Sequence, residues 1–563
     1  MMETFSVYCQ NTDRTYACTP GTRLLDLLLE IQPASRYPVV AALVDNQLKE
    51  LGHSLYHSAC IRFLDMAHPD GQRTYSRSLS FVLQKAVADC YPELHLVLEY
   101  NLPNGIYGEL HKKEAGLPLV TLSSDQVAHL EARMRELIAE DLPIRKVKMP
   151  SQEAAALFEA QGKLQKARLV ENSDRYYVSV YYLDDYPDTF YGPLLYSTGA
   201  LYYFELIPFS KGFCLQSPNY ATPDRKVREV YQDKLAEAFQ ESAHWYFILG
   251  ADSIAQVNEL VRKGKARDLI QLMEALHERK YAQIADRIYQ QRDRLKLVLI
   301  SGPSSSGKTT TSKRIALQCQ VLGLNPIVIA MDDYFLDREH TPRDENGDYD
   351  FESLYAMDLP FLNQQMNELF AGQEVELPVF DFKQGKRVFK DRRIRMKEGD
   401  VLIMEGIHAL NPNLLPDVEE DRVFRIYASA LTALSIDENN LISTSDNRML
   451  RRMVRDNATR GIVPEETILR WPSVRRGEER NIFPFQENAD VFFNSSMIFE
   501  LPLLRYYAEP LLSRIPVSSP AYAESVRLRK FLSLVVPLSP AEIAIIPPTS
   551  ILREFIGGST FDY

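Results

Sequence analysis

The stretch KLVLISGPSSSGKTT, residues 296–310, decides the fold of the carboxy-terminal half. An apolar run at 296–300 is followed at once by small residues and then by a helical pattern from Ser312. Gly302, Gly307, Lys308 and Thr309 match the spacing GxxxxGK followed by Ser or Thr, which joins a strand to a helix in phosphate-binding loops. Small residues let successive backbone N–H groups converge on phosphate oxygens at a helix N-terminus that already favours negative charge. The stretch therefore predicts a nucleotide site in an α/β domain.

Within this loop, two side chains have specific expected roles. Lys308 is expected to reach the β- and γ-phosphates, and the Thr309 hydroxyl is expected to ligate Mg²⁺. The expected ATP-binding residues are Gly302, Ser304, Ser305, Ser306, Gly307, Lys308, Thr309 and Thr310. ATP and Mg²⁺ are thus the predicted cofactors.

Two carboxylates follow two further buried apolar runs. The run PIVIAM at 326–331 is followed by Asp332, and the run VLIM at 401–404 is followed by Glu405. Open α/β sheets bind ligands at the carboxyl ends of their strands, so we expect both carboxylates near the loop. Asp332 can accept a proton from an attacking hydroxyl, and Glu405 can support the metal or its waters. Thr309 and Glu405 are therefore the predicted metal residues.

A basic helical pattern, RMLRRMVRDNATR, occupies residues 448–460. Its arginines at 448, 451, 452 and 455 recur at helical spacing, so several share a face, and Arg460 follows near a Gly461 stop. Guanidinium groups suit phosphate contact, and a mobile arginine lid can neutralise charge during phosphoryl transfer. Arg452 and Arg455 are therefore candidate catalytic residues. A solvated charged face is the alternative interpretation.

Two aromatic residues lie between the carboxylates in the string LPVFDF, residues 377–382. Phe380 and Phe382 could stack on a base or a ribose. Packing in an ordinary hydrophobic core explains them equally well.

Six strings occur in the order typical of one family: GPSSSGKTT, MDDYF, YDFESLYAMD, LPVFDF, MEGIHAL and RRMVRDNATRG. Residues from about 295 to 500 therefore resemble the phosphoribulokinase and uridine kinase family. The resemblance implies that Asp332 is the base that deprotonates a 5′-hydroxyl and that Glu405 assists the metal site. It places Glu352 where uridine kinases hold the ribose hydroxyls with an Asp.

The resemblance also gives a set of expected substrate contacts. These are Asp332, Tyr334, Glu352, Phe380, Phe382 and Arg460. One position departs from the family pattern: Gly385 stands where uridine kinases usually place a His that reads the pyrimidine. The identity of the base is therefore left open.

The pattern of residues 1–66 predicts a hairpin, then a helix, then further strands. The predicted helix lies in the string TPGTRLLDLLLE, residues 19–30. The string PGTRLLDLL resembles the TGS domain found at the start of threonyl-tRNA synthetases. This resemblance implies a compact β-grasp domain.

Residues 67–223 mix helices with aromatic-rich strands and resemble the second domain of the same synthetases, which removes mischarged amino acids there. Tyr75 and Leu79 stand where that family has two histidines, and YGPLLYSTG at 191–199 has neither Cys nor His. A hydrolytic site without ligands or a base cannot work by that mechanism. We expect a degenerate editing-like α+β domain kept for binding or architecture. No synthetase core is visible afterwards, so aminoacylation is not expected.

The predicted fold class is α/β, with a carboxy-terminal P-loop kinase preceded by the β-grasp and α+β domains. Residues 224–294 are dense in helix formers and predict a helical linker. Residues 295–510 form the expected kinase domain, with a parallel sheet flanked by helices. Residues 511–563 are expected to pack on it as an extension.

Composition restricts the class of protein. The 563 residues carry a net charge of −12, which argues against broad non-specific nucleic-acid binding. Neither a CxxC pair nor an apolar stretch of eighteen residues occurs, and the amino terminus does not have the pattern of a secretory signal. We therefore expect a cytoplasmic protein without a membrane partner.

The predicted function is transfer of the γ-phosphate of ATP to the 5′-hydroxyl of a uridine- or cytidine-like nucleoside. One alternative is a nucleotide-binding regulator that contacts tRNA or ribosomes through its amino-terminal half, although the guanine-specific NKxD sequence is absent. Another is a kinase for a different alcohol, such as a sugar phosphate or pantothenate. A homo-oligomer is compatible with the sequence, which does not specify the oligomeric state, the regulation or the acceptor.

Overall fold

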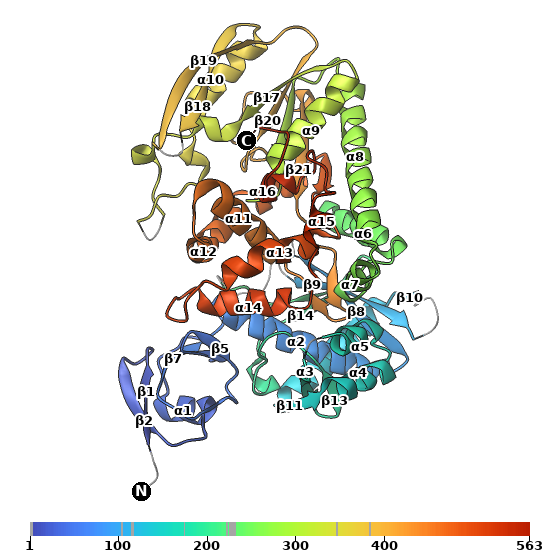
Figure 1. The fold of residues 1–563 in the computed structure, drawn as a ribbon, viewed down its shortest axis with the longest axis vertical. Helices are drawn as coiled ribbons and strands as arrows, with labels where there is room; N and C mark the ends of the chain where they lie inside the picture. Colours follow the sequence, from blue (N-terminus) through green and yellow to red (C-terminus); the bar gives the residue numbers. More distant parts are fainter. Residues whose placement is uncertain are drawn as a thin grey trace.

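The computed structural model describes residues 4–102, 105–113, 118–173, 175–220, 223, 232–344, 347–381 and 384–562. Figure 1 shows the amino-terminal elements at one end of the molecule and the β18–β19 hairpin at the other. Among the described residues, none of the helices is both long and apolar enough to cross a membrane.

The first unit is a mixed five-stranded sheet that packs against helix α1. Its elements are β1 (Phe5–Cys9), β2 (Arg14–Cys18), β3 (Thr22–Arg23), α1 (Leu24–Ile31), β4 (Ala41–Val44), β5 (Gln47–Lys49), β6 (Ser54–Leu55) and β7 (Ala59–Leu64). The strand order is β2-β1-β7-β4-β5, with β1 and β7 parallel. Apolar residues of α1 and of the central strands, such as Leu24 and Ile61, form one small core.

The second unit combines two antiparallel sheets with helices. Its elements are α2 (Pro69–Cys90), β8 (Leu94–Leu102), β9 (Gly105–Lys112), β10 (Leu119–Val120), α3 (Ser124–Ala139), β11 (Ile144–Pro150), α4 (Ser151–Ala160), α5 (Leu164–Glu171), β12 (Tyr177–Leu183), β13 (Tyr186–Asp188), η1 (Thr198–Ala200), β14 (Glu205–Phe209) and β15 (Gly212–Gln216). Tyr75 and Leu79 lie fully buried on α2, and the Tyr75 hydroxyl donates to the Tyr203 carbonyl at 2.7 Å. These two positions therefore serve packing.

Three helices lead into the kinase-like half: α6 (Asp233–Ile248), α7 (Ile254–Arg262) and α8 (Ala266–Gln290). Their buried faces share one hydrophobic core with the parallel sheet that follows, and α8 packs along the first helix after the phosphate-binding loop. These helices are thus part of the support of the candidate site.

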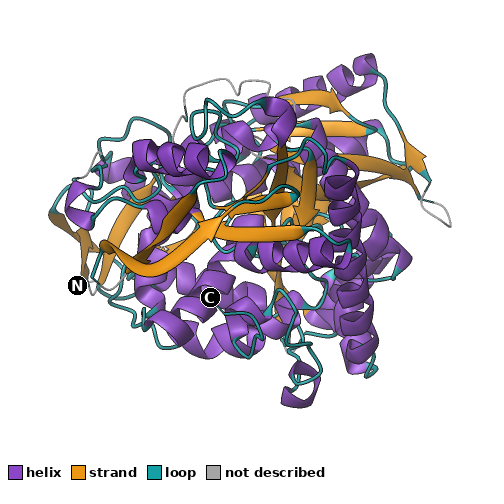
Figure 2. Ribbon diagram, turned by 90° about the horizontal axis from the view of Figure 1, so that it is seen from above, coloured by secondary structure: helices purple, strands orange, loops and turns teal. Residues whose placement is uncertain are grey.

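The carboxy-terminal half is built on a five-stranded parallel sheet with the order β17-β20-β16-β21-β24. Its strands are β16 (Leu297–Ser301), β17 (Asn325–Ala330), β20 (Asp400–Glu405), β21 (Val423–Ser429) and β24 (Val491–Asn494). The central strand β16 is buried along its whole length, as expected for a strand covered on both faces. Helices surround the strands in the view of Figure 2. The predicted parallel sheet flanked by helices is confirmed.

The helices of this half are α9 (Lys308–Val321), α10 (Leu359–Phe370), α11 (Thr444–Arg460), α12 (Pro464–Asn481), α13 (Glu500–Leu512), α14 (Tyr522–Leu532), α15 (Pro540–Ile543) and α16 (Arg553–Ile556). Short 3-10 turns are η2 (Met331–Tyr334), η3 (Arg338–His340), η4 (Leu354–Ala356), η5 (Glu420–Arg422) and η6 (Phe483–Asn488). Strands β18 (Glu374–Asp381) and β19 (Lys386–Arg395) form a separate hairpin.

A second hairpin ties the two halves together. It consists of β22 (Ser435–Asp437) and β23 (Asn440–Leu441), and its turn residue Glu438 docks on the second unit. The Glu438 carbonyl accepts the Leu98 N–H at 2.9 Å, and its carboxylate accepts the Gln165 N–H at 2.7 Å. The halves are therefore joined by directional hydrogen bonds as well as by apolar contact.

A buried lysine completes this junction. Lys166 is fully buried and pairs with Asp188 of its own unit, and it lies 3.5 Å from Asp437 of the hairpin. A buried charge is costly unless it is paired, so Lys166 and Asp437 depend on one another, while Asp188 is shared between Lys166 and the buried Lys163, which lies 3.1 Å from it.

We expect Lys166→Ala to lower the free energy of unfolding by about 3–5 kcal/mol, because it removes the shared partner of two buried carboxylates. A thermal unfolding scan should show a lower Tm. Lys263→Ala is the matched control, since Lys263 pairs with Glu259 on the surface. An unchanged Tm in Lys166→Ala would contradict the role given to this junction.

Candidate functional site

The phosphate-binding loop runs between the end of β16 and the start of α9. Its backbone turns through left-handed conformations at Ser305, with φ of 59°, and at Gly307, with φ of 84°. A Cβ atom at Gly302 would lie 1.9 Å from the Ala428 carbonyl oxygen, so only glycine allows the loop to approach β21 this closely. The sequence signature thus forms the expected strand, loop and helix.

Polar groups of the loop gather at the N-terminus of α9. The Lys308 ammonium donates back to the Pro303 carbonyl at 3.2 Å. The hydroxyl oxygens of Ser305 and Ser306 are buried and have no hydrogen-bond partner among the described residues. Unpaired buried hydroxyls at a helix N-terminus, where the first N–H groups have no partner inside the helix, suit an anionic ligand such as a phosphate.

Thr309 and Glu405 meet beside this loop. The Thr309 hydroxyl donates to a Glu405 carboxylate oxygen at 2.8 Å. Burial raises the pKa of Glu405 to about 7, and the nearby Lys308 opposes this shift. Hydroxyl and carboxylate oxygens are the donors that Mg²⁺ prefers, so these two side chains fit the predicted metal.

Asp332 lies next to this pair because β17 and β20 are neighbours, with Ala330 opposite Glu405. Its side chain is exposed, and desolvation by neighbouring protein groups raises its pKa. The cationic groups of Lys308, Arg460 and Arg455 act in the opposite direction on this pKa. The carboxylate is therefore set among positive charges at the carboxyl end of the sheet.

Glu352 approaches the same region from the loop after η3. Its side chain packs against Gly477 of α12, where a Cβ atom would come within 2.3 Å of it. Burial and the nearby Glu478 raise the pKa of Glu352 to about 7, while Arg452 and Lys308 lower it. The structure thus brings Glu352 into the electrostatic field of the phosphate-binding loop.

Two arginines of α11 hold the loop rather than cover it. Arg448 and Arg451 are fully buried, and they pair with Glu478 and Glu500 respectively. The Nη2 group of Arg448 donates to Glu478 at 2.7 Å, and that of Arg451 donates to Glu500 at 2.8 Å. Arg448 also donates to the Ser304 carbonyl at 3.0 Å. The expectation that these two belong to a mobile lid is wrong, because buried guanidinium groups with matched carboxylates are fixed in place.

The remaining arginines of α11 are more accessible. Arg452 donates to the Ser304 hydroxyl at 3.0 Å and retains 20% of its side-chain exposure. Arg455 and Arg460 lie near the buried Asp456, at 2.8 and 3.7 Å. Arg452 thus reaches the loop, and Arg455 and Arg460 act electrostatically on Asp332.

Three of the expected substrate contacts are aromatic residues, of which two are buried and one lies outside the described residues. Tyr334 is fully buried and its hydroxyl donates to Gln365 at 2.8 Å, so its prediction as a substrate contact is wrong. Phe380 packs in the hydrophobic core against Phe335, with ring centroids 5.8 Å apart, which agrees with the core alternative. Phe382 lies outside the described residues.

Glu554 is a residue of the site that no sequence motif predicts. The Glu554 carboxylate of α16 accepts the Thr310 hydroxyl at 2.6 Å and the Thr310 N–H at 3.3 Å. The two residues lie 244 positions apart, and no motif connects them.

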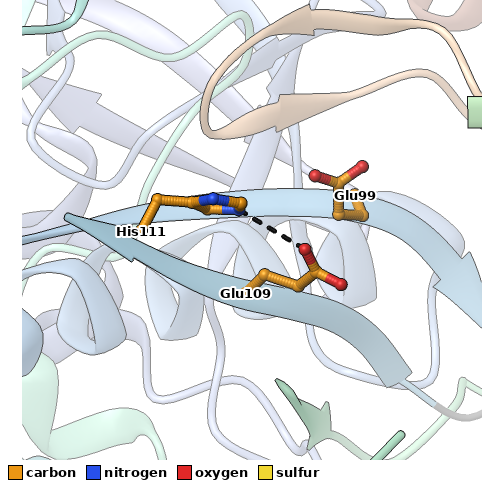
Figure 3. A group of neighbouring side chains, drawn as sticks. All are labelled: Glu99, Glu109 and His111. Carbon is orange, nitrogen blue, oxygen red and sulfur yellow. Dashed lines mark ion pairs between the residues drawn. The ribbon is translucent and has the colours of Figure 1, made fainter. Parts of the chain in front are cut away.

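A cluster in the second unit was also not anticipated. Glu99, Glu109 and His111 of β8 and β9 have ligand-type atoms within 4.8 Å of one another (Figure 3). His111 pairs with Glu109 at 3.4 Å, and the Tyr107 hydroxyl donates to Glu109 at 2.7 Å. Burial raises the pKa of Glu99 to about 7. Internal pairing accounts for Glu109 and His111 without a further ligand.

Comparison with known proteins covers both parts of the chain. A threonine–tRNA ligase of Halorhodospira halophila is 28% identical over 209 residues, which are 35% of this chain and 32% of the ligase. The chain therefore spans about a third of that relative's length. A possible uridine kinase of Bacillus stearothermophilus and a D-glycerate 3-kinase of Cryptococcus neoformans have solved structures with 19% and 14% identity and TM-scores of 0.24 and 0.22. They cover 35% and 45% of this chain and 88% and 87% of their own chains.

The carboxy-terminal half has a more specific match. A uridine kinase of Staphylococcus epidermidis is 30% identical over 196 residues, which are 35% of this chain and 85% of that enzyme. Residues 297–499 match the model of the Phosphoribulokinase / Uridine kinase family. This region contains the phosphate-binding loop, Asp332, Glu405 and the arginines of α11. Through it, the chain belongs to the phosphoribulokinase/uridine kinase family of ATP-dependent kinases.

Proposed function

We propose that this protein transfers the γ-phosphoryl group of ATP to a hydroxyl of a small molecule, with a nucleoside as the favoured acceptor. One observation carries the proposal: Lys308, the Thr309–Glu405 pair and Asp332 converge at the carboxyl ends of β16, β20 and β17. Phosphoryl transfer needs groups that bind the triphosphate, ligands for a metal ion and a proton acceptor, and these residues supply all three.

The loop and α11 bind and orient the triphosphate. Backbone N–H groups at the start of α9, together with Lys308, hold the phosphate oxygens. Mg²⁺ held by Thr309 and Glu405 would neutralise charge on the phosphates. Arg452 and Arg455 stabilise the charge that spreads over the transferred group.

Asp332 orients the acceptor hydroxyl and accepts its proton at a carboxylate oxygen. The transition state of phosphoryl transfer needs little covalent help, so positioning and electrostatics supply most of the rate. The nearby Lys308, Arg455 and Arg460 favour the ionised form of Asp332 and oppose the desolvation that raises its pKa, and the ionised carboxylate is the form that accepts a proton.

Two kinds of acceptor are compatible with the site. We assign Glu352 the role of holding hydroxyls of a ribose, and its electrostatic interaction with Lys308 and Asp332 supports this role. Gly385 has φ of 67°, and a Cβ atom there would lie 2.8 Å from the Arg338 guanidinium. An arginine thus lies where a base-reading histidine is usual, which keeps an acceptor with a phosphate group as the second candidate.

The amino-terminal half has a separate candidate role. Its ligase-like segment supports contact with tRNA, as does a groove whose lining includes Lys49, Lys146 and Arg175 together with Lys530 of α14, although Glu50 in the same groove pairs with Lys146 at 3.0 Å. This contact remains a prediction, which gel retardation of tRNA by the full chain tests directly.

Lys308→Ala and Asp332→Asn should each reduce turnover by roughly 10²-fold or more, because one loses the phosphate grip and the other the proton acceptor. The measurement is ATP consumption with a panel of nucleosides, ribulose 5-phosphate and pantothenate. Asp421→Asn makes the same charge change at the amino end of β21, which is the end of the sheet opposite the site, and should keep wild-type rates. Wild-type turnover by folded Asp332→Asn would end the base assignment.

A nucleoside acceptor should bind better as pH rises from 6 to 8, because Glu352 ionises near its raised pKa of about 7 and its carboxylate accepts hydroxyl hydrogen bonds more strongly than the acid. The acceptor KM at saturating Mg-ATP should therefore fall over this range. Glu352→Gln should remove the pH dependence. A KM in the variant that follows the wild-type profile would contradict the role of Glu352.

A further inference from the structure

The carboxy-terminal segment returns to the phosphate-binding loop after packing on the kinase-like half (Figure 1). Ile551, Leu552 and Phe555 anchor it in the main hydrophobic core, each only 1% exposed. The Arg314 guanidinium of α9 donates to the Thr549 carbonyl at 2.5 Å. The segment is therefore docked directly on the helix that follows the loop.

Its contact with the loop is made by a carboxylate. Glu554 accepts both the backbone N–H and the hydroxyl of Thr310, in the first turn of α9. The first N–H groups of a helix have no partner inside the helix, and together with the dipole they form an anion site. Glu554 thus occupies donors that belong to the phosphate-binding end of the helix.

Ile551 reinforces this position. A Cβ atom at Gly307 would lie 2.5 Å from the Ile551 side chain, so the segment also covers the turn of the loop. Gly307 and Thr310 bracket Lys308 and Thr309, the residues expected to hold the triphosphate and its metal. The segment therefore contacts the loop on both sides of its central residues.

A phosphate and the Glu554 carboxylate cannot share these donors. Two anions at one pair of donors repel each other, and each Thr310 donor serves one acceptor well. Glu405 is a further acidic group close to Glu554, which adds to the negative charge on this side of the loop.

We propose that Glu554 is an internal, autoinhibitory occupant of the triphosphate site, which ATP must displace from Thr310 in order to bind fully. This inference rests on the proposed function, since it assumes that the loop binds a nucleoside triphosphate. By thermodynamic reciprocity, ATP binding then weakens the contact between Glu554 and Thr310 to the same extent that this contact weakens ATP binding.

The local structure permits this displacement without removing the apolar anchors. Helix α16 has only four residues, and Gly557 and Gly558 follow it with φ of 84° and 75°. A short turn next to glycines can change its backbone at little steric expense. Glu554 can therefore leave Thr310 while Ile551 and Phe555 stay buried.

The test measures the Kd of Mg-ATP by isothermal titration for the full-length chain and for Glu554→Gln and Glu554→Ala. Glu554→Gln removes the charge and keeps an acceptor oxygen, whereas Glu554→Ala removes both. Both variants should bind ATP more tightly, by about tenfold, a typical size for coupling between sites. Glu542→Gln is the matched control and should bind like wild type, because Glu542 precedes this segment in the carboxy-terminal extension and caps α15.

Hydrogen exchange of the wild-type chain provides an independent readout. Mg-ATP should increase the exchange of amides in residues 553–558, and the increase should be smaller in Glu554→Ala. Protection of this segment by ATP would overturn the inference.

The outcomes separate the two proposals. If wild type binds ATP and the Glu554 variants bind it equally or more weakly, the inference fails and the proposed function stands. Reduced Tm with unchanged ATP affinity means that Glu554 only caps α9, and it also overturns the inference. If none of the proteins binds a nucleoside triphosphate, both proposals are overturned.

Discussion

Two buried ion pairs beneath the phosphate-binding loop are the constraint on which the candidate site depends. Arg448 with Glu478 and Arg451 with Glu500 fix α11 against α12 and α13, and both guanidinium groups also donate to carbonyls of the loop. The loop is thereby pre-shaped before any ligand is present. Because a preorganised site needs no rearrangement during reaction, these pairs support catalysis without touching the reacting atoms.

Buried ion pairs and hydrogen bonds also join distant parts of the chain. The β22–β23 hairpin extends from the kinase-like half into the second unit, where Lys166 and Glu438 fix it. At the other end of the sequence, residues 549–556 return to α9. Segments from distant parts of the chain therefore hold the second unit to the kinase-like half and hold the carboxy-terminal residues to the helix that follows the phosphate-binding loop.

Much of this arrangement could be predicted from the sequence because parallel strands impose it. The loop signature placed a strand and a helix, and Asp332 and Glu405 had to meet since both follow buried strands of one sheet. The partners of Arg448 and Arg451 could not be predicted, because Glu478 and Glu500 lie 30 and 49 residues away in other helices. Tyr334 was mistaken for a ligand contact since burial of a phenol depends on tertiary packing, and Glu554 follows no motif.

Magnesium-dependent binding of ATP to the purified chain tests the central claim most directly. Calorimetric titration should show saturable ATP binding that weakens strongly when EDTA removes Mg²⁺ and that is lost in Lys308→Ala. This result would establish the loop from Gly302 to Thr310 as the binding site of the triphosphate. Absence of magnesium-dependent affinity for every nucleoside triphosphate would contradict the account.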